Sequence, residues 1–261
     1  MRDNTKERVL ENVTYESTKL NEYIENVLQL EAVACKDWLT NKVDRSVTGR
    51  IARQQCQGEI QLPLSDCGVV ALDYTGKAGI ATSIGHAPQA ALADPKAGSV
   101  LSIAEALTNI VGANLKNGLK SVSLSANWMW PCRNEGEDAA LYSAVKACSD
   151  FACALGINIP TGKDSLSMTQ KYGDKKVVSP GTVIISAGAE VKDVKKTVSP
   201  VVQAKDSSIY YVDFSNDELK LGGSALSQVL NKVGSDVPTV KSSEFINPFL
   251  HTNHKDLVRL R

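Results

Sequence analysis

The apolar residues of this sequence change spacing repeatedly between residues 67 and 186, and this change restricts the fold. Short apolar or β-branched runs, typical of strands, lie at 67–72, 79–83, 121–126, 157–159 and 182–186. Segments 94–112 and 137–156 instead repeat apolar residues at intervals of three and four, as on one face of a helix. Strands mixed with helices in this order predict an α+β fold.

Turn and capping residues support these boundaries. Asp94 and Pro95 are suited to the N-cap and first turn of one helix, and Gly156 to the end of the other. Residues 73–77 separate the first two strand runs, so we predict a β-hairpin whose turn has Gly76 available for a positive φ. Residues 5–34 carry helical spacing without Gly or Pro and predict a helical lead-in.

Composition excludes several classes of protein. The 261 residues contain 29 Lys+Arg and 29 Asp+Glu, and this balance argues against binding nucleic acid or an anionic membrane through bulk charge. No apolar run approaches the roughly 20 residues of a membrane span, and the charged N-terminus does not resemble a signal peptide. We therefore expect a cytoplasmic protein with neither nucleic acid nor membrane as a partner.

The six cysteines form no CxxC pair and have no nearby histidine, so zinc-ligand spacing is absent. We expect reduced thiols, with Cys148 and Cys153 filling the core beside one helix.

Glu105 and Asn109 lie four residues apart on a predicted helix, away from its apolar stripe. Their side-chain oxygens could share one hard cation, or they could lie on a solvated helix face. Asp66, just before a predicted strand, could add a third oxygen ligand or form a turn.

Other polar segments leave two interpretations each. Residues 160–165 contain Gly, Lys and Ser but do not match the Walker spacing, so a phosphate loop and a plain polar loop remain open. Residues 222–224 could bind phosphate or form a glycine turn with an N-cap. The loop 127–136, with two tryptophans, could line a pocket or cap the core. His86 is the only histidine in the well-patterned region, so no catalytic triad is proposed.

Several longer motifs resemble a known enzyme family. They lie at 43–50 (VDRSVTGR), 54–56 (QQC), 62–67 (LPLSDC), 99–109 (SVLSIAEALTN), 124–132 (LSANWMWPC) and 162–168 (GKDSLSM). Together they resemble the large, glutamine-dependent phosphoribosylformylglycinamidine synthases of purine biosynthesis, over roughly residues 40 to 230.

The resemblance implies an AIR-synthetase-like N-terminal domain, whose mixed sheet contributes to a shared barrel with helices outside. It predicts a helical lead-in from a preceding domain at 1–40, the N-terminal domain at 41–197, and the truncated start of a C-terminal domain at 198–261. A strand pattern at 209–213 and the glycine turn at 221–224 begin that last segment. The chain is thus expected to be part of a longer protein.

The same resemblance implies a site for Mg²⁺ and ATP or ADP. The residues matching Asp66, Glu105 and Asn109 bind Mg²⁺ in the family, and the residue matching Ser65 touches the nucleotide. A further aspartate ligand of the family belongs to the following domain and has no match here. The family's catalytic residues also have no counterpart, so no catalytic residue is assigned.

The implied function is a part of the ligase that converts formylglycinamide ribonucleotide, glutamine and ATP to formylglycinamidine ribonucleotide, ADP, phosphate and glutamate. This part is expected to carry the auxiliary nucleotide–Mg²⁺ site and to be inactive alone. One alternative is a structural or assembly module, and another is an independent phosphate-binding ligase. Expected partners are the nucleotide, the remaining domains of the synthase, and a second copy joined through exposed sheet edges.

Overall fold

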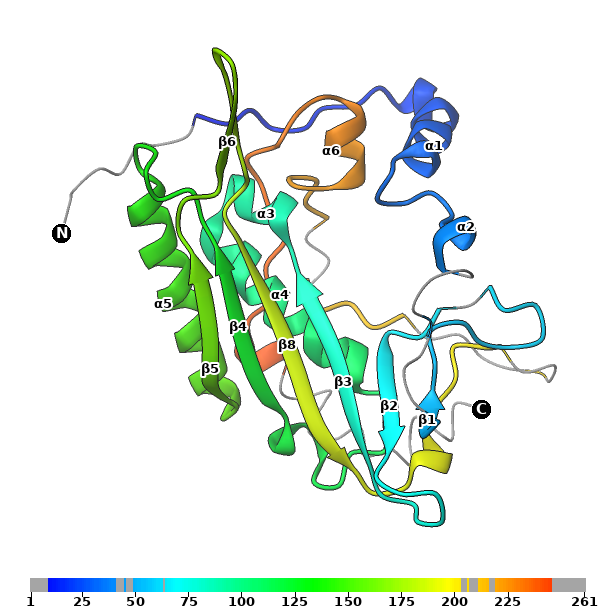
Figure 1. The fold of residues 1–261 in the computed structure, drawn as a ribbon. Coiled ribbons are helices and arrows are strands. Elements are labelled where there is room, and N and C mark those ends of the chain that lie inside the picture. Colours follow the sequence, from blue (N-terminus) through cyan, green and yellow to red (C-terminus); the bar gives the residue numbers. More distant parts are fainter. Residues whose placement is uncertain are drawn as a thin grey trace.

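A six-stranded mixed sheet forms the centre of the structure, a computed structural model that describes residues 9–40, 45, 49–62, 64–202, 206, 211–215 and 219–245 (Figure 1). Its strands run in the order β1 (Ile51–Arg53), β2 (Cys67–Ala71), β3 (Gly79–His86), β8 (Thr182–Val191), β4 (Ser123–Met129) and β5 (Asn158–Ser165). Only the β4–β5 pair is parallel. Strands β6 (Thr169–Tyr172) and β7 (Lys175–Val178) form a separate hairpin.

The α-helices are α1 (Leu20–Gln29), α2 (Asp37–Thr40), α3 (Pro88–Ala93), α4 (Pro95–Ile110), α5 (Glu137–Leu155) and α6 (Ala225–Val229). Short 3₁₀ turns occur at Ser17–Lys19, Gly118–Ser121 and Val194–Lys196. The expected α+β class is confirmed, as are the β2–β3 hairpin and the two long helices. In none of the described segments is there a helix long and apolar enough to cross a membrane.

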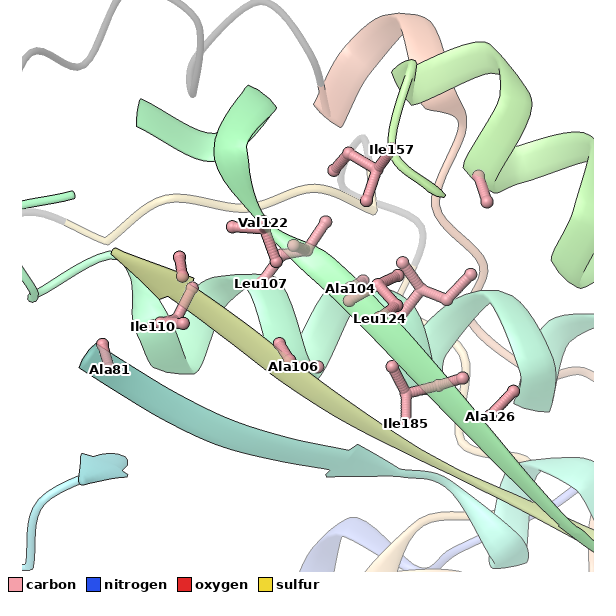
Figure 2. Packing of buried hydrophobic residues seen from close by; sticks show 14 of the residues in the cluster. Ala81, Ala104, Ala106, Leu107, Ile110, Val122, Leu124, Ala126, Ile157 and Ile185 are labelled. Carbon is pink, nitrogen blue, oxygen red and sulfur yellow. The ribbon is translucent and has the colours of Figure 1, made fainter. Parts of the chain in front are cut away.

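The sheet is covered by α4 and α5 on one face. Residues of β3 alternate between buried and exposed along the whole strand, because period-two geometry points successive side chains to opposite faces. The buried side contributes to a core with β4, β8, α4 and α5, and Figure 2 shows Leu107 and Ile110 along α4, with Leu124 and Ile185 on the strands that pack over this helix. On the other face, Ile80 and Ile84 remain 45% and 55% exposed. In Figure 1, β3, β8 and β4 lie in front of α4.

Helix α4 lies unusually close to β3. A Cβ added at Gly85 would approach Ser102 O to 2.2 Å and Ala106 N to 2.4 Å, so only glycine fits there. Two residues earlier, the buried Ser83 Oγ donates a hydrogen bond to Ala106 O at 2.6 Å. The small residues of the helix therefore allow contact between its backbone and the strand.

The helix ends follow the predicted capping. The Asp94 side chain accepts a hydrogen bond from Lys96 N at 2.8 Å and Pro95 opens α4. Gly156 ends α5 with φ 68°. Gly76, available for a positive φ, does not adopt one. The Asp73 carboxylate bonds the Gly76 N–H and occupies the space that a Cβ would need.

Other expectations are corrected by backbone pairing. Residues 160–165, expected to be a loop, belong to β5 because they pair with β4. The first three residues of the expected loop 127–136 likewise belong to β4. Of the predicted strand 209–213, residues 209–210 lie outside the described residues, and 211–213 form no strand because no neighbouring strand pairs with them. The lead-in helix is shorter than 5–34, with α1 ending at Gln29.

The end of the described chain packs on the same core. Phe245, 1% exposed, lies 6.0 Å from Phe151 and 4.9 Å from Phe214, measured between ring centroids. Residues assigned from the sequence to 198–261 thus complete the core of the segment before them. Most of the tail at 245–254 lies outside the described residues.

All six cysteines are free, but only one of the two on α5 fills the core. Cys148 is buried, whereas Cys153 is exposed, because the five-residue spacing turns it to the outer side of the helix. Burial raises the pKa of the Cys148 thiol to about 11.

Replacing Gly85 by Ala is expected to lower the free energy of unfolding by ~1–3 kcal/mol, because the added methyl group pushes α4 from β3. Gly188→Ala, on β8, is the matched control, since a Cβ there meets nothing within 4 Å. Urea unfolding measures both. Equal stability of the two variants would contradict the close packing.

Cys153→Ser should remove one fast-reacting thiol from the folded protein in a maleimide titration between pH 7 and 9. Cys148→Ser should remove none, because a thiol with a pKa of about 11 stays protonated in that range and is buried. Fast labelling of Cys148 would show that α5 opens readily.

Candidate functional site

Ser65 and Asp66 lie at the start of β2, where a folded loop places them. The Ser65 N–H donates to Gln55 O at 2.7 Å, and Cys56 forms an isolated antiparallel bridge with Leu64. These contacts close the loop 54–65. The chain then enters β2 at Cys67, so Asp66 is the last residue before the sheet.

Glu105 and Asn109 bind the backbone of β3. Glu105 Oε2 accepts from His86 N at 2.6 Å, and Asn109 Nδ2 donates to Ile84 O at 2.9 Å. The helical spacing of the two residues matches the spacing of two alternate residues on the strand. Neither side chain therefore lies on an uncontacted helix face.

Those β3 groups belong to the edge that faces β2. The Leu72 N–H donates to Ala78 O, so even-numbered residues of β3 direct their backbone groups toward β2. Regular pairing of β2 with β3 begins at Cys67–Ser83. Glu105 and Asn109 thus form hydrogen bonds with backbone groups of β3 that lie beyond the start of β2. This is the end of the strand pair where Asp66 lies.

The donor set is chemically suited to a hard divalent cation. It comprises the Asp66 carboxylate, the second oxygen of Glu105, and the amide oxygen of Asn109, whose nitrogen is already used. Mg²⁺ prefers oxygen ligands of this kind and shares its shell with phosphate. Within the described ranges, no three His, Cys, Asp or Glu side chains cluster to hold a metal. The structure places Glu105 and Asn109 on one edge of β3, and Asp66 lies at the same end of the β2–β3 pair.

A cavity of about 610 Å³ opens on the uncovered face of the sheet beside this edge. Its lining includes Arg45, Arg53, Ser65, Asp66, Thr82 and Ile84. Glu105 and Asn109 do not line the cavity. Asn109 donates a hydrogen bond to the carbonyl of Ile84, and Ile84 does line the cavity. The Ser65 Oγ and the Arg45 Nε are buried without a hydrogen-bond partner among the described residues.

Cys67, which lines the cavity, and Cys132, which is not part of its lining, remain thiols at neutral pH. Burial raises the pKa of Cys67, and the nearby Arg53 only partly opposes this shift. Burial also raises the pKa of Cys132, with Asp138 and Glu137 adding to the shift. Neither residue has the lowered pKa of an activated nucleophile.

The other sequence candidates have structural explanations. Trp130 is buried and donates Nε1–H to Glu137 Oε2 at 3.1 Å, so it caps the core. Trp128 instead lines a second cavity, of about 350 Å³, so both interpretations of this segment apply. Ser224 accepts from Ser227 N at 3.1 Å as the N-cap of α6, which favours the glycine-turn interpretation. Lys163 lies on β5 opposite Asn127 and donates to Ser165 Oγ at 3.0 Å.

Sequence reasoning missed Arg45 as a site residue, although it lies within a motif that carried the resemblance. Its placement against the cavity depends on the loop 54–65 folding back, and no local pattern around residue 45 indicates that contact.

Comparisons with known proteins give consistent matches. Residues 35–190 match the family described as FGAR-AT PurM_N-like domain. The chain is 43% identical over 227 residues to a human protein named phosphoribosylformylglycinamidine synthase, covering 86% of this chain and 17% of that protein. A protein of Arabidopsis thaliana named as a probable phosphoribosylformylglycinamidine synthase is 41% identical over 229 residues, covering 87% and 16%. The chain therefore spans about a sixth of the length of these relatives.

Solved structures give weaker likenesses. PurLQS from Thermotoga maritima has a TM-score of 0.49 and 15% identity, covering 75% of this chain and 29% of that chain. PurL of the same organism, complexed with ADP, has a TM-score of 0.48 and 15% identity, covering 74% and 29%. Both scores lie below 0.5, so the family assignment depends on the sequence matches.

Proposed function

Because this chain belongs to the FGAR-AT PurM_N-like domain family, we propose that it is a segment of a phosphoribosylformylglycinamidine synthase and carries an auxiliary nucleotide–Mg²⁺ site of that enzyme. The whole protein would be an ATP-dependent ligase. It would convert formylglycinamide ribonucleotide, glutamine and ATP to formylglycinamidine ribonucleotide, ADP, phosphate and glutamate. The names of the human and plant relatives support this assignment.

The observation that carries the site proposal is that Glu105 and Asn109 are both anchored on the β3 backbone, at the end of the β2–β3 pair where Asp66 lies. Glu105 and Asn109 are held on β3 by backbone hydrogen bonds, which leave one oxygen of each for a ligand. Asp66 lies at the same end, beside Ser65. In this proposal the three oxygens bind Mg²⁺, and the ion would neutralise charge on the nucleotide phosphates.

The unsatisfied Ser65 hydroxyl supports a ligand in the adjoining cavity. Buried polar atoms nearly always have a hydrogen-bond partner, and this one has none among the described residues. In this proposal the hydroxyl, which is shielded from solvent in this structure, turns into the cavity that Ser65 lines and donates to a phosphate oxygen.

Calorimetry of the full chain with ADP is expected to show binding that requires Mg²⁺. Asp66→Ala and Glu105→Ala should each weaken that binding at least about tenfold, because a charged ligand of the cation is lost. Asp150→Ala is the matched control, since Asp150 is an exposed carboxylate on α5 paired with Lys146. A folded wild type that does not bind ADP would refute the site.

A second candidate function is an assembly module, favoured by the uncovered sheet face. Ile80 and Ile84 are apolar and half-exposed on this face of β3, with Thr82 between them, and Val70 of β2 lies opposite Ile80. Apolar sheet faces of this kind are normally covered by another layer. The cover would be another domain of the full-length synthase or a second copy of this chain.

Sedimentation of the isolated chain is expected to detect a dimer that Ile80→Lys shifts to monomer, because the lysine charge would be buried in the contact. Tyr142→Lys, at an exposed position on α5 behind the sheet, should leave the dimer intact. Association unaffected by Ile80→Lys would exclude the sheet face as its interface.

A further inference from the structure

The β6–β7 hairpin carries an excess of positive charge. Residues 169–178 contain three lysines and one acid, namely Lys171, Lys175, Lys176 and Asp174. Lys171 pairs directly with Lys176 across the two strands, and like charges in this position destabilise a hairpin. A two-stranded hairpin is also only marginally stable in water, and no described strand of the main sheet pairs with this one. These properties indicate a contact with an acidic surface.

The two faces of the hairpin differ. Lys176 donates to Asn134 Oδ1, so its face of the hairpin lies against the loop after β4. Successive side chains of a strand point to opposite faces, and the register therefore puts Tyr172, Lys175 and Val177 on the other face. Tyr172 is 65% exposed and Val177 is 56% exposed. That face thus combines an exposed apolar area with a cation.

Helix α1 has the complementary surface. Leu20, Ile24 and Leu28 lie four residues apart along one side of the helix, and each is about half exposed. Glu25, three residues before Leu28, is an exposed carboxylate next to this apolar stripe. Residues 16–37 contain five acidic residues and two lysines. The α1 surface is therefore apolar like the hairpin face but opposite to it in charge.

The hairpin and α1 lie on opposite sides of one end of the sheet. In Figure 1 the hairpin lies above β4 and β5, and α1 lies above β1 and β2. The uncovered face of the sheet, with Ile80 and Ile84, extends between these two sides. A two-fold axis that runs along the strands in front of this face exchanges the two sides. It would therefore bring each hairpin to the α1 of a second copy.

We propose that the β6–β7 hairpin and α1 form the charged rim of a symmetric contact between two copies of this chain, with Lys175 of one copy beside Glu25 of the other. This inference rests on the assembly function proposed above, in which the sheet face is the interface, and adds the contact that orients the two copies. The sheet face supplies buried apolar area. Paired charges at the rim fix the register of the two copies, because any other register places like charges together.

A charge swap tests the contact, with sedimentation of the full chain as the measurement. Lys175→Glu and Glu25→Lys should each raise the dissociation constant of the dimer at least about tenfold, because every symmetric dimer then holds two like-charge contacts. The double variant should return it to within about threefold of the wild type, since each pair is restored with reversed sign. Lys120→Glu is the matched control, because Lys120 is exposed and precedes β4, at the other end of the sheet.

A second variant tests the apolar part of the contact without changing charge. Tyr172→Ser should weaken the dimer about tenfold, because the exposed ring no longer covers the stripe on α1. Tyr74→Ser is its control, since Tyr74 is 83% exposed in the turn between β2 and β3. Circular dichroism checks that each variant is folded.

The outcomes separate this inference from the assembly proposal. A double charge variant that dimerises no more tightly than the single variants would overturn the pairing of the hairpin with α1. A dimer that Ile80→Lys abolishes but that Lys175→Glu leaves unchanged would also overturn it, and the assembly proposal would stand. A folded wild type that stays monomeric would refute both.

Discussion

The close approach of α4 to β3 is the contact on which the rest of the structure depends. Gly85 leaves no room for a side chain, and Ser83 ties the strand to the carbonyl of Ala106. Because the helix is fixed at this distance, Glu105 and Asn109 reach the β3 backbone directly. The packing that forms the core therefore also sets the positions of two proposed cation ligands.

The two faces of the sheet differ: one packs against helices, and the other carries the cavity. One face buries apolar side chains against α4 and α5, and this burial supplies most of the driving force for folding. The other face has no such cover in the described chain and carries the cavity with Arg45, Ser65 and Asp66. Buried polar groups that lack partners there lower the free energy of unfolding of the isolated chain.

Neither Cys67 nor Cys132 is an activated nucleophile. Cys67 and Cys132 remain protonated at neutral pH because burial raises the pKa of each. Asp66, Glu105 and Asn109 instead offer oxygen atoms of the kind that a hard cation prefers. This chemistry agrees with an auxiliary nucleotide site in a larger ligase, as proposed from the family membership.

Sequence patterns determined the local elements: the β2–β3 hairpin, the capped helices α4 and α5, and the helical spacing of Glu105 and Asn109. These features depend on neighbours within a few residues, which a sequence displays directly. Tertiary structure decided what depends on distant contacts. Residues 160–165 became a strand because β4 offered a pairing edge, and Phe245 joined the core beside Phe151. Arg45 reached the cavity because the loop 54–65 folds back to it, and no short-range pattern encodes that contact.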